Sequence, residues 1–561
     1  MAANGPDTVR RYLRLKADRA NHDDRWEMMA PFLAPSRVGI LGQFAPGEKQ
    51  TRGVYDSTTM MAAETMAHFI AGNVINPSQR WFGYRMRDPA VAQSDSVREW
   101  LEECRDRTLK RLAASPFYAE GPEALIDYGG FGTGFLMCEE APQPVNRTIK
   151  GFRGFYFHAE KTGRFCIAEG ADGLVDTAFR EFQLTARVAN EQWGERGSLP
   201  ESIRTALAAG KVDEPFKFIH AIYPRPRSEQ GYGAKGMAWA SCWVELESKH
   251  VCFESGYNTF PAACPRYHKT PGDVYGRGRG DLAFPDTWTL NTAKRMGLED
   301  WALKIRPPIL VRSDSVFGTL KMIPGGPTSI NTHGGRIQDT IMPFQTGSHP
   351  EVSHINEENL RQSINKIFFV ETIWKLLETE KSEMTAFEFA KKLELLFRLF
   401  GPVYGRLEWE FLHQNVDITF DLQLAAGAFS PPPPEVFMSD GQIDIEFQNP
   451  IARAQRAADV EALTLAVNDL APLSQMFPEI FDPIDPDKTA AGVLDIRGVP
   501  AKWRRNDDEI ASIRSERHKQ NQQENALAQL EQAAGAAGKA APALKMLQGG
   551  GPQGVAVGAG K

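Results

Sequence analysis

The sequence predicts an α+β protein, with a mixed helix-and-sheet first half followed by a helix-rich central segment. Two observations support this prediction. Residues 286–404 show the pattern of helix, Gly/Pro-rich insert, helix, short charged loop and helix. From Tyr128 to Phe253, aromatic and apolar residues occur at short spacing among glycines, which is typical of antiparallel strands. We therefore expect a sheet in the first half and two long helices around a small folded insert.

The first half begins with helical patterns and then changes to strand patterns. The third helical pattern stops at Ser115-Pro116, because proline cannot continue a helix. The predicted helices are Asp7 to Met29, Met60 to Ile70 and Asp95 to Ala113, and the clearest predicted strands lie within Phe216 to Tyr223 and Cys242 to Phe253.

The central helices are predicted over Thr287 to Lys304 and Ile355 to Leu377. The first ends before Pro307-Pro308, since the residue before a proline avoids the helical conformation. The insert between them contains Pro324-Gly325-Gly326-Pro327, which is turn chemistry. The second helix has apolar residues on one face of a 3.6-residue period: Leu360, Ile364, Ile367, Ile373, Trp374 and Leu377.

The last third returns to mixed structure and ends in a low-complexity tail. Thr385 to Glu388 matches a capping box that opens a helix to Phe400. The further expected elements are a helix over Tyr404 to His413, a strand over Gln442 to Phe447, a helix over Ile451 to Leu470, a polar helix over Asp507 to Leu530, and disorder over 531–561, where Gly and Ala dominate.

Composition excludes several classes of protein. The chain has 561 residues, enough for two or more domains, and its formal net charge of -7 argues against tight wrapping of nucleic acid. No apolar run approaches the ~18–20 residues of a membrane helix, and the N-terminus lacks the apolar core of a signal peptide. Six cysteines are too few for a disulfide scaffold, so we expect synthesis in a reducing cytosol.

Several motifs resemble active sites only superficially. Gly129 to Gly134 lacks the order of a dinucleotide-binding loop, and the chain has no P-loop, so it is not an ATP-driven motor. His250, Cys252, Cys264 and His268 are zinc-ligand types at a spacing foreign to zinc knuckles, which favours buried thiols and surface imidazoles. The aromatic cluster from Phe152 to Phe157 has two readings. It is either a stacking platform for single-stranded nucleic acid or, as is more common for such residues, part of the core of the sheet. We predict no cofactor and no enzyme activity.

Several segments resemble the head-to-tail connecting proteins, or portal proteins, of short-tailed double-stranded DNA phages. Their order along roughly Asp7 to Arg517 carries the resemblance more than any single motif does. The segments are Trp26 to Pro35, Tyr55 to Thr58 followed by Ala71 to Pro77, Trp81-Phe82, Tyr275 to Gly278 with Leu290-Asn291, Gly401 to Leu407, and Pro450 to Gln455.

This resemblance implies a ring of twelve subunits at one vertex of the capsid, with double-stranded DNA passing through the centre. It divides the chain into wing (1–284), first stem helix (285–306), a small β-containing clip (307–352), second stem helix (353–378), tunnel loop (379–384), wing again (385–450), and a helical crown (451–530). The implied partners are the terminase large subunit, a tail adaptor protein, the major capsid and scaffolding proteins, and internal core proteins. No membrane is implied.

The charged side chains of the second stem helix and the loop after it are our candidates for the channel wall. A mildly acidic wall with scattered basic residues would guide DNA without trapping it. The alternative is that these side chains are solvent-exposed charges on a helix face with no role in the channel. The channel candidates are Arg361, Lys366, Lys375, Glu378, Glu380 and Lys381, and the candidates for the clip interface are Arg312, Lys321 and Arg336.

The runner-up is a metal-dependent nucleic-acid enzyme, such as a nuclease, with an α+β core at 128–284. Divalent-metal-dependent cleavage by the purified protein would favour it over a portal subunit.

Overall fold

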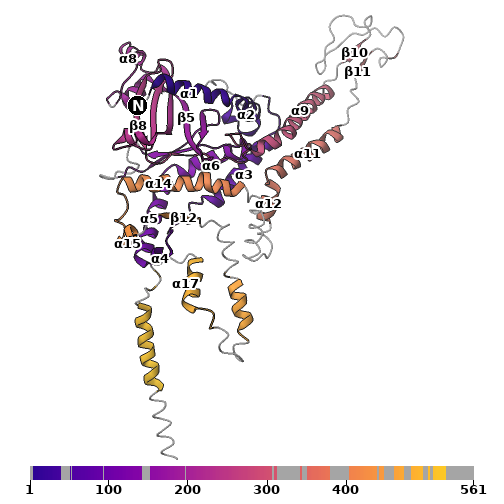
Figure 1. Ribbon diagram of the computed structural model, residues 1–561. Coiled ribbons are helices and arrows are strands. Elements are labelled where there is room, and N and C mark those ends of the chain that lie inside the picture. The colour runs from indigo at the N-terminus through magenta and orange to yellow at the C-terminus, as the bar shows by residue number, and fades with distance from the viewer. Residues whose placement is uncertain are drawn as a thin grey trace, which may run out of the picture.

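A large antiparallel sheet forms one end of the body, and two helices project from the body side by side (Figure 1). The computed structural model describes residues 4–39, 51, 53–92, 94–141, 152–195, 197–305, 309–311, 336, 341–343, 350–378, 403–438, 441–447, 460, 462–472, 482–496, 503, 505 and 509–525.

The large sheet has five strands in the order of the chain, and every neighbouring pair is antiparallel. The predicted strand over Phe216 to Tyr223 is confirmed as β6. The strand pattern predicted within Cys242 to Phe253 is a hairpin of two paired strands, whose turn holds Lys249 at a φ of 57°. The strands are β4 (Phe165–Glu169), β5 (Val175–Thr185), β6 (Pro215–Pro224), β7 (Trp239–Glu245) and β8 (Val251–Tyr257).

A smaller sheet and a two-stranded ribbon complete the body. β2 (Leu136–Glu140) lies between β3 (Phe155–Ala159) and β9 (Ala262–Ala263). The ribbon pairs β1 (Phe82–Met86) with β12 (Ile443–Phe447), which confirms the strand predicted near the end of the chain. This pairing joins segments far apart in the sequence, so the insert between them leaves from one body and returns to it.

The N-terminal helical pattern forms two helices, where we predicted one. α1 (Gly5–Asp18) and α2 (Ala20–Leu33) are separated at Arg19, whose backbone caps the first helix. The buried Arg19 guanidinium donates to the carbonyl oxygens of Phe165 and Gly163 and pairs with Asp23 at 2.7 Å. The break therefore lets α1 pack on the five-stranded sheet while Arg19 closes the end of β4.

The next helices follow their predictions with small differences. α3 (Thr58–Val74) is longer than predicted, and α5 (Asp95–Ala113) has the predicted bounds. Tyr128, where we predicted the change to strands, still lies in α6 (Phe117–Gly130), because its buried ring belongs to the helix face in the core. The remaining short elements are η1 (Pro35–Arg37), α4 (Pro89–Ala92), α7 (Ala186–Trp193), α8 (Glu201–Ala208), η2 (Arg227–Glu229), η3 (Ala234–Gly236), α15 (Pro434–Met438) and α17 (Pro486–Ile496).

The projecting pair is α9 (Arg279–Ile305) and α11 (Pro350–Ile367), with the hairpin of β10 (Ile309–Val311) and β11 (Ile341–Pro343) at its far end (Figure 1). α9 begins eight residues before the predicted start and includes Pro285, although proline disfavours a helix interior. The predicted second helix is interrupted after Ile367 and continues as α12 (Val370–Glu378).

The returning helix is longer than predicted. It runs from 403 through a π-helical segment, η5 (Glu408–His413), into α14 (Gln414–Ala425). Phe411 and Val416 are buried in the main core, so packing extends this helix past His413. Residues 462–470 and 509–525 are helical, as predicted for those stretches, whereas 379–400 and 526–561 lie outside the described residues.

Arg19→Met should lower the free energy of unfolding of the body by about 3–5 kcal/mol, since Asp23 would remain buried without its cation. The control is Arg10→Met, which removes a solvent-exposed pair with Asp7 and should change stability by less than about 0.5 kcal/mol. Chemical denaturation followed by tryptophan fluorescence compares the two. Equal stability of the two variants would contradict this account of the break between α1 and α2.

Candidate functional site at the base of the paired helices

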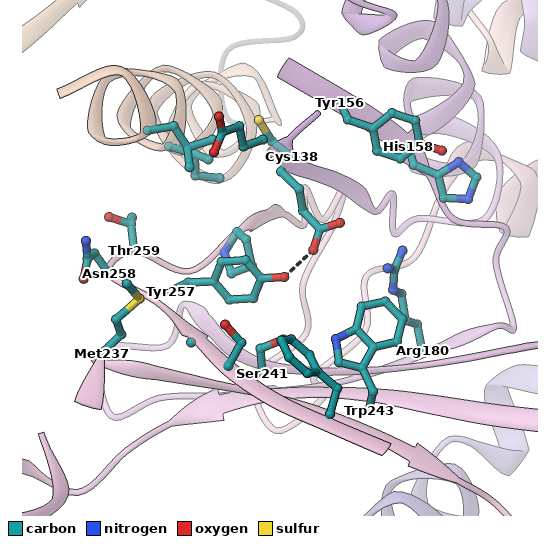
Figure 2. A pocket seen from close by; sticks show the side chains of 18 of the residues that line it. Cys138, Tyr156, His158, Arg180, Met237, Ser241, Trp243, Tyr257, Asn258 and Thr259 are labelled. Atoms are coloured by element: carbon teal, nitrogen blue, oxygen red, sulfur yellow. Dashed lines mark hydrogen bonds between the residues drawn. The ribbon is translucent and has the colours of Figure 1, made fainter. Parts of the chain in front are cut away.

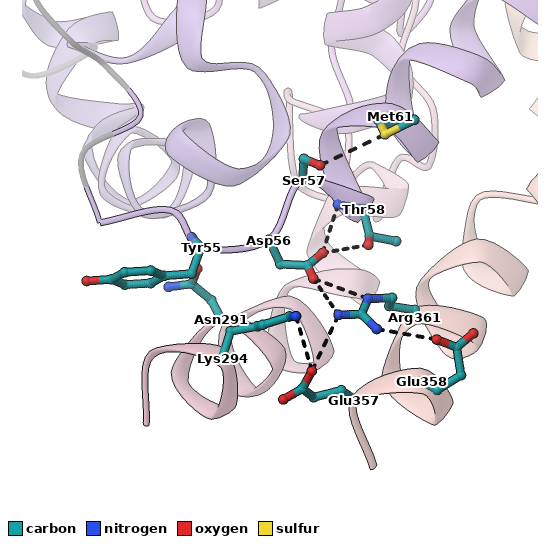
Figure 3. Close-up of polar contacts among 10 residues, drawn as sticks. All are labelled: Tyr55, Asp56, Ser57, Thr58, Met61, Asn291, Lys294, Glu357, Glu358 and Arg361. Atoms are coloured by element: carbon teal, nitrogen blue, oxygen red, sulfur yellow. Dashed lines mark hydrogen bonds and ion pairs between the residues drawn. The ribbon is translucent and has the colours of Figure 1, made fainter. Parts of the chain in front are cut away.

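Three elements meet where the paired helices leave the body: the N-terminus of α3, the middle of α9 and α11 (Figure 3). Asp56 lies just before α3, and one of its carboxylate oxygens accepts from the backbone N–H of Thr58 at 2.9 Å and from the Thr58 hydroxyl. A negative charge at this end of a helix also interacts favourably with the helix dipole. Asp56 therefore caps α3.

The second oxygen of Asp56 binds α11. It accepts from Nη2 of Arg361 at 3.0 Å and from Nε at 3.2 Å. The same guanidinium reaches Glu357 at 3.5 Å and Glu358 at 3.3 Å, and Lys294 of α9 lies 3.4 Å from Glu357. Glu357 is only 7% exposed, so its charge depends on these two cations.

Protonation of this network is set by its hydrogen bonds. Partial burial opposes the charged form of Asp56, but the hydrogen bonds from Thr58 and from the Arg361 guanidinium outweigh it and lower the pKa of Asp56. Likewise the contact with Asp56 raises the pKa of Arg361 against the effect of desolvation. The pair is therefore ionised over the whole neutral range.

Hydrogen bonds outside the ion pairs fix the same junction. The backbone N–H of Tyr55 donates to the side chain of Asn291 at 2.7 Å, and Asn291 donates to the carbonyl oxygen of Gly53 at 3.1 Å. Ser363 donates to Asp286 at 2.6 Å, which joins α11 to α9 directly. The segment before α3 thus acts as a clamp on both projecting helices and sets the angle at which they leave the body.

A sharp bend follows on the return side, at Phe369 between α11 and α12. Phe369 has a φ of 60°, a strained conformation for a bulky residue. The Arg279 guanidinium lies 4.5 Å from the centre of the Phe369 ring and donates to the Tyr267 hydroxyl at 2.7 Å. This cation–π contact holds the bend against the start of α9.

The predicted channel residues differ in their exposure and in their ion-pair partners. Lys366 is exposed on α11, and Lys375 is 76% exposed on α12, 3.8 Å from Glu371. Arg361 instead has three carboxylate partners within its own chain, so its place in the channel wall stays a prediction. Glu378 is the last residue of α12, and Arg336 is exposed in the insert. The other predicted residues, Glu380, Lys381, Arg312 and Lys321, lie outside the described residues.

Sequence reasoning missed two features of this site. Asp56 was part of a recognised motif, but its partner Arg361 is 305 positions away, and no local pattern pairs them. The second is the apolar surface of α9, which was visible in the sequence as a helix with apolar residues on more than one face.

The residues that resembled zinc ligands in the sequence have structural roles. Cys252 and Cys264 are buried free thiols, and His250 is hydrogen-bonded to Ser198 at 2.9 Å. In the described ranges, no three His, Cys, Asp or Glu side chains are grouped as metal ligands would be. None of the described helices combines the length and apolar character needed to span a membrane.

The family model for bacteriophage head to tail connecting protein matches residues 7–504. The chain is 26% identical over 538 residues to the probable portal protein of Bordetella phage BPP-1, covering 94% of each chain. It is 24% identical over 527 residues to the portal protein of Salmonella phage epsilon15, covering 93% of this chain and 92% of that one.

Among solved structures, chains from gene transfer agent particles show a weak likeness. One comes from the neck of an empty particle, with 12% identity, a TM-score of 0.33, and coverage of 76% of this chain and 92% of that chain. Another, from the native virion, has 12% identity and a TM-score of 0.28, with coverage of 76% and 91%. Scores this low do not define the fold.

The class of protein is therefore a phage connector, located in the virion where head meets tail. This chain belongs to the bacteriophage head to tail connecting protein family, and its similarity to two phage portal proteins confirms the resemblance seen in the sequence.

Asp56→Asn should loosen the junction, because the neutral amide gives up the charge-assisted bond to Arg361. We expect a cost of about 1–2 kcal/mol for the partly exposed pair, or about 5–30-fold faster local opening. Hydrogen exchange of the backbone amides at the start of α3 and in α11 measures it. Glu358→Gln is the control, since it removes an exposed partner of the same Arg361 and should change exchange less than about threefold. Unchanged exchange in Asp56→Asn would contradict the clamp.

The pH dependence of this clamp follows from the lowered pKa of Asp56. Because the folded-state pKa lies below the unfolded value of about 3.9, the stabilisation is complete above that pH and is lost as pH falls through the folded pKa. The difference in exchange between wild type and Asp56→Asn should be constant from about pH 8 to pH 5 and shrink below about pH 4. A difference that vanishes already near pH 6 would show that another group controls the junction.

Proposed function

We propose that this chain is the subunit of a portal ring through which double-stranded DNA enters the phage head and later leaves it. The observation that supports a ring most directly is the surface of α9. Two exposed apolar stripes run along this helix, with side chains between 41% and 72% exposed. One stripe is Leu298, Trp301 and Ile305, and the other is Leu282, Met296 and Leu303.

The two stripes lie on nearly opposite sides of α9. Within a stripe, residues are spaced by three, four, seven or fourteen positions, which returns them to one face at 3.6 residues per turn. Met296 and Leu298 are two positions apart, so their side chains point in roughly opposite directions. Lys294, which meets Glu357 of α11, lies four positions before Leu298 and seven before Trp301, so α11 packs on the side of the first stripe, nearer the body. The exposed outer part of that stripe, and the second stripe on the opposite side, would be covered by two neighbouring subunits.

Identical copies can supply both neighbours only through a heterologous contact, in which one face of each subunit meets a different face of the next. Such contacts close into a ring when the rotation between copies divides a full turn, and we propose a dodecamer. The clamp at Asp56 and Arg361 would give each copy the same helix angle, which closure requires.

In this ring α11 and α12 would face the axis and α9 would face outward. The exposed Lys366 and Lys375 would meet the phosphates of passing DNA, and the acidic Glu378 and Glu380 would keep the wall from adhering. The clip, with Arg312, Lys321 and Arg336, would dock the terminase large subunit during packaging and the tail adaptor protein afterwards. The body would contact the major capsid and scaffolding proteins, and the crown the internal core proteins.

This role needs no catalytic residue, and we propose that the chain is not an enzyme. The runner-up, a metal-dependent nuclease with its core at 128–284, has no supporting observation. The family match runs through those residues, so they form part of the connector.

Trp301→Glu should prevent ring closure without unfolding the subunit, because the side chain is 62% exposed in the single chain. Burying a charge in the proposed interface costs several kcal/mol. Arg295→Glu is the control: it changes charge on the same helix, on the exposed face between the stripes. Native mass spectrometry should find subunits or short oligomers for Trp301→Glu and closed rings for the control. Rings of normal size in Trp301→Glu would contradict the proposed interface.

The double variant Lys375→Glu and Lys381→Glu should still assemble but package less DNA or release it early, since the wall would repel phosphates. The double variant Lys211→Glu and Lys235→Glu, at two exposed positions of the body, gives a matched change of charge away from the channel. Packaged DNA length per particle is the measurement. Packaging equal to the control would refute the assignment of these lysines.

A further inference from the structure

A cavity of about 830 Å³ lies in the body between the five-stranded sheet on one side and β2, β3 and α14 on the other (Figure 2). Its volume is in the range of small-molecule pockets, roughly 300–1,000 Å³. None of the proposed channel or clip residues lines it. The proposed function of the ring therefore leaves this cavity without a role.

Aromatic rings form much of the lining. Trp243 and Tyr257 come from β7 and β8, and Tyr156 of β3 is 44% exposed although its neighbours Phe155 and Phe157 are buried. The sequence predicted the cluster around Tyr156 to be sheet core, which holds for those two phenylalanines but not for Tyr156 itself. Figure 2 shows Tyr257 in the middle of the cavity, with Tyr156 and His158 toward one end and Asn258 and Thr259 toward the other. Faces of such rings attract organic cations.

The charged lining is acidic. Four carboxylates line the cavity against two arginines, which gives 2 − 4 = −2 with neutral His158 and −1 when His158 is protonated. Two of the carboxylates are neutralised locally: Glu140 lies 3.3 Å from Arg153, and Glu160 lies 3.3 Å from Arg180. The hydrogen bond to Glu160 raises the pKa of His158. At this end of the cavity, basic side chains therefore offset the negative charge of the carboxylates.

Among the described residues, the other two carboxylates, Glu139 and Asp421, accept hydrogen bonds from hydroxyl groups. The Tyr257 hydroxyl donates to Glu139, and the Thr259 hydroxyl donates to Asp421. Neither carboxylate forms an ion pair with another residue in the part of the chain that the structure describes. Glu139 faces the cavity from β2 and Asp421 faces it from α14. The uncompensated negative charge therefore lies on two separate elements of the cavity lining.

We propose that this cavity binds a small aliphatic diamine or polyamine, whose ammonium groups neutralise Glu139 and Asp421 while its carbon chain lies against the aromatic rings. The cavity suits an amine better than a metal ion, because most of its lining is aromatic and apolar and the carboxylates come from separate elements. The proposal does not depend on ring formation, so it can fail while the portal function holds.

Calorimetric titration of the purified full-length chain tests it with four probes. Putrescine is the dication, butylamine the monocation, butanediol the neutral analogue, and Nα-acetyl-lysine amide represents a lysine from another polypeptide. We expect putrescine to bind, butylamine to bind more weakly and butanediol not to bind. Glu139→Gln, which keeps an acceptor for Tyr257, should weaken putrescine binding by about tenfold or more.

Two further variants separate a binding effect from a folding effect. Tyr156→Leu changes an exposed ring and should weaken binding by roughly two- to fivefold. Glu201→Gln removes a carboxylate on α8 that is 84% exposed and should bind like wild type. Equal binding by Glu139→Gln and Glu201→Gln, butanediol binding as well as putrescine, or no putrescine binding at millimolar concentration would overturn the proposal. Tighter binding of the lysine derivative than of putrescine would overturn the small-molecule assignment and give the cavity to a neighbouring chain.

Discussion

The structure depends on one constraint: α9 carries more apolar surface than the described part of its own chain covers. One side of its inner end is buried in the body, where Ala283 and Leu290 have almost no exposure. Farther out, α11 is its neighbour among the described residues, and tryptophan, leucine, methionine and isoleucine side chains are exposed on two sides. Leaving such surface in water costs roughly 1.5–3 kcal/mol for each large side chain, and association with two neighbours removes that cost. In the proposed ring, this gain in free energy would drive assembly.

Assembly of this kind would need rigid subunits, and ion pairs between distant segments hold the body together. The clamp at Asp56 and Arg361 fixes the projecting helices to α3. Arg266, nearly fully buried, pairs with Glu410 at 2.6 Å and so joins the returning helix to the loop that follows β9. Each pair connects segments that are distant in sequence. Together they make the departure and the return of the inserted helices parts of one framework.

Elements whose signals are local could be predicted from the sequence. α5 was predicted with its observed bounds, since Ser115-Pro116 follows its periodic apolar residues. The antiparallel sheet followed from its aromatic residues among glycines. The bend at Phe369 could not be predicted, because neither glycine nor proline marks it, and its strained backbone is held by Arg279 from another helix. The continuation into α14 was missed for a similar reason, since tertiary packing of Val416 extends a helix whose polar residues favoured an end. The channel candidates were chosen by charge alone, and charge does not reveal that Arg361 has partners within its own chain.

Imaging the purified full-length chain by cryo-electron microscopy tests ring closure most directly. The account predicts closed rings of twelve copies, each with the α9–α11 pair around a central opening and with the two apolar stripes of α9 covered by different neighbours. Discrete monomers or face-to-face dimers at micromolar concentration, with both stripes still in solvent, would contradict it.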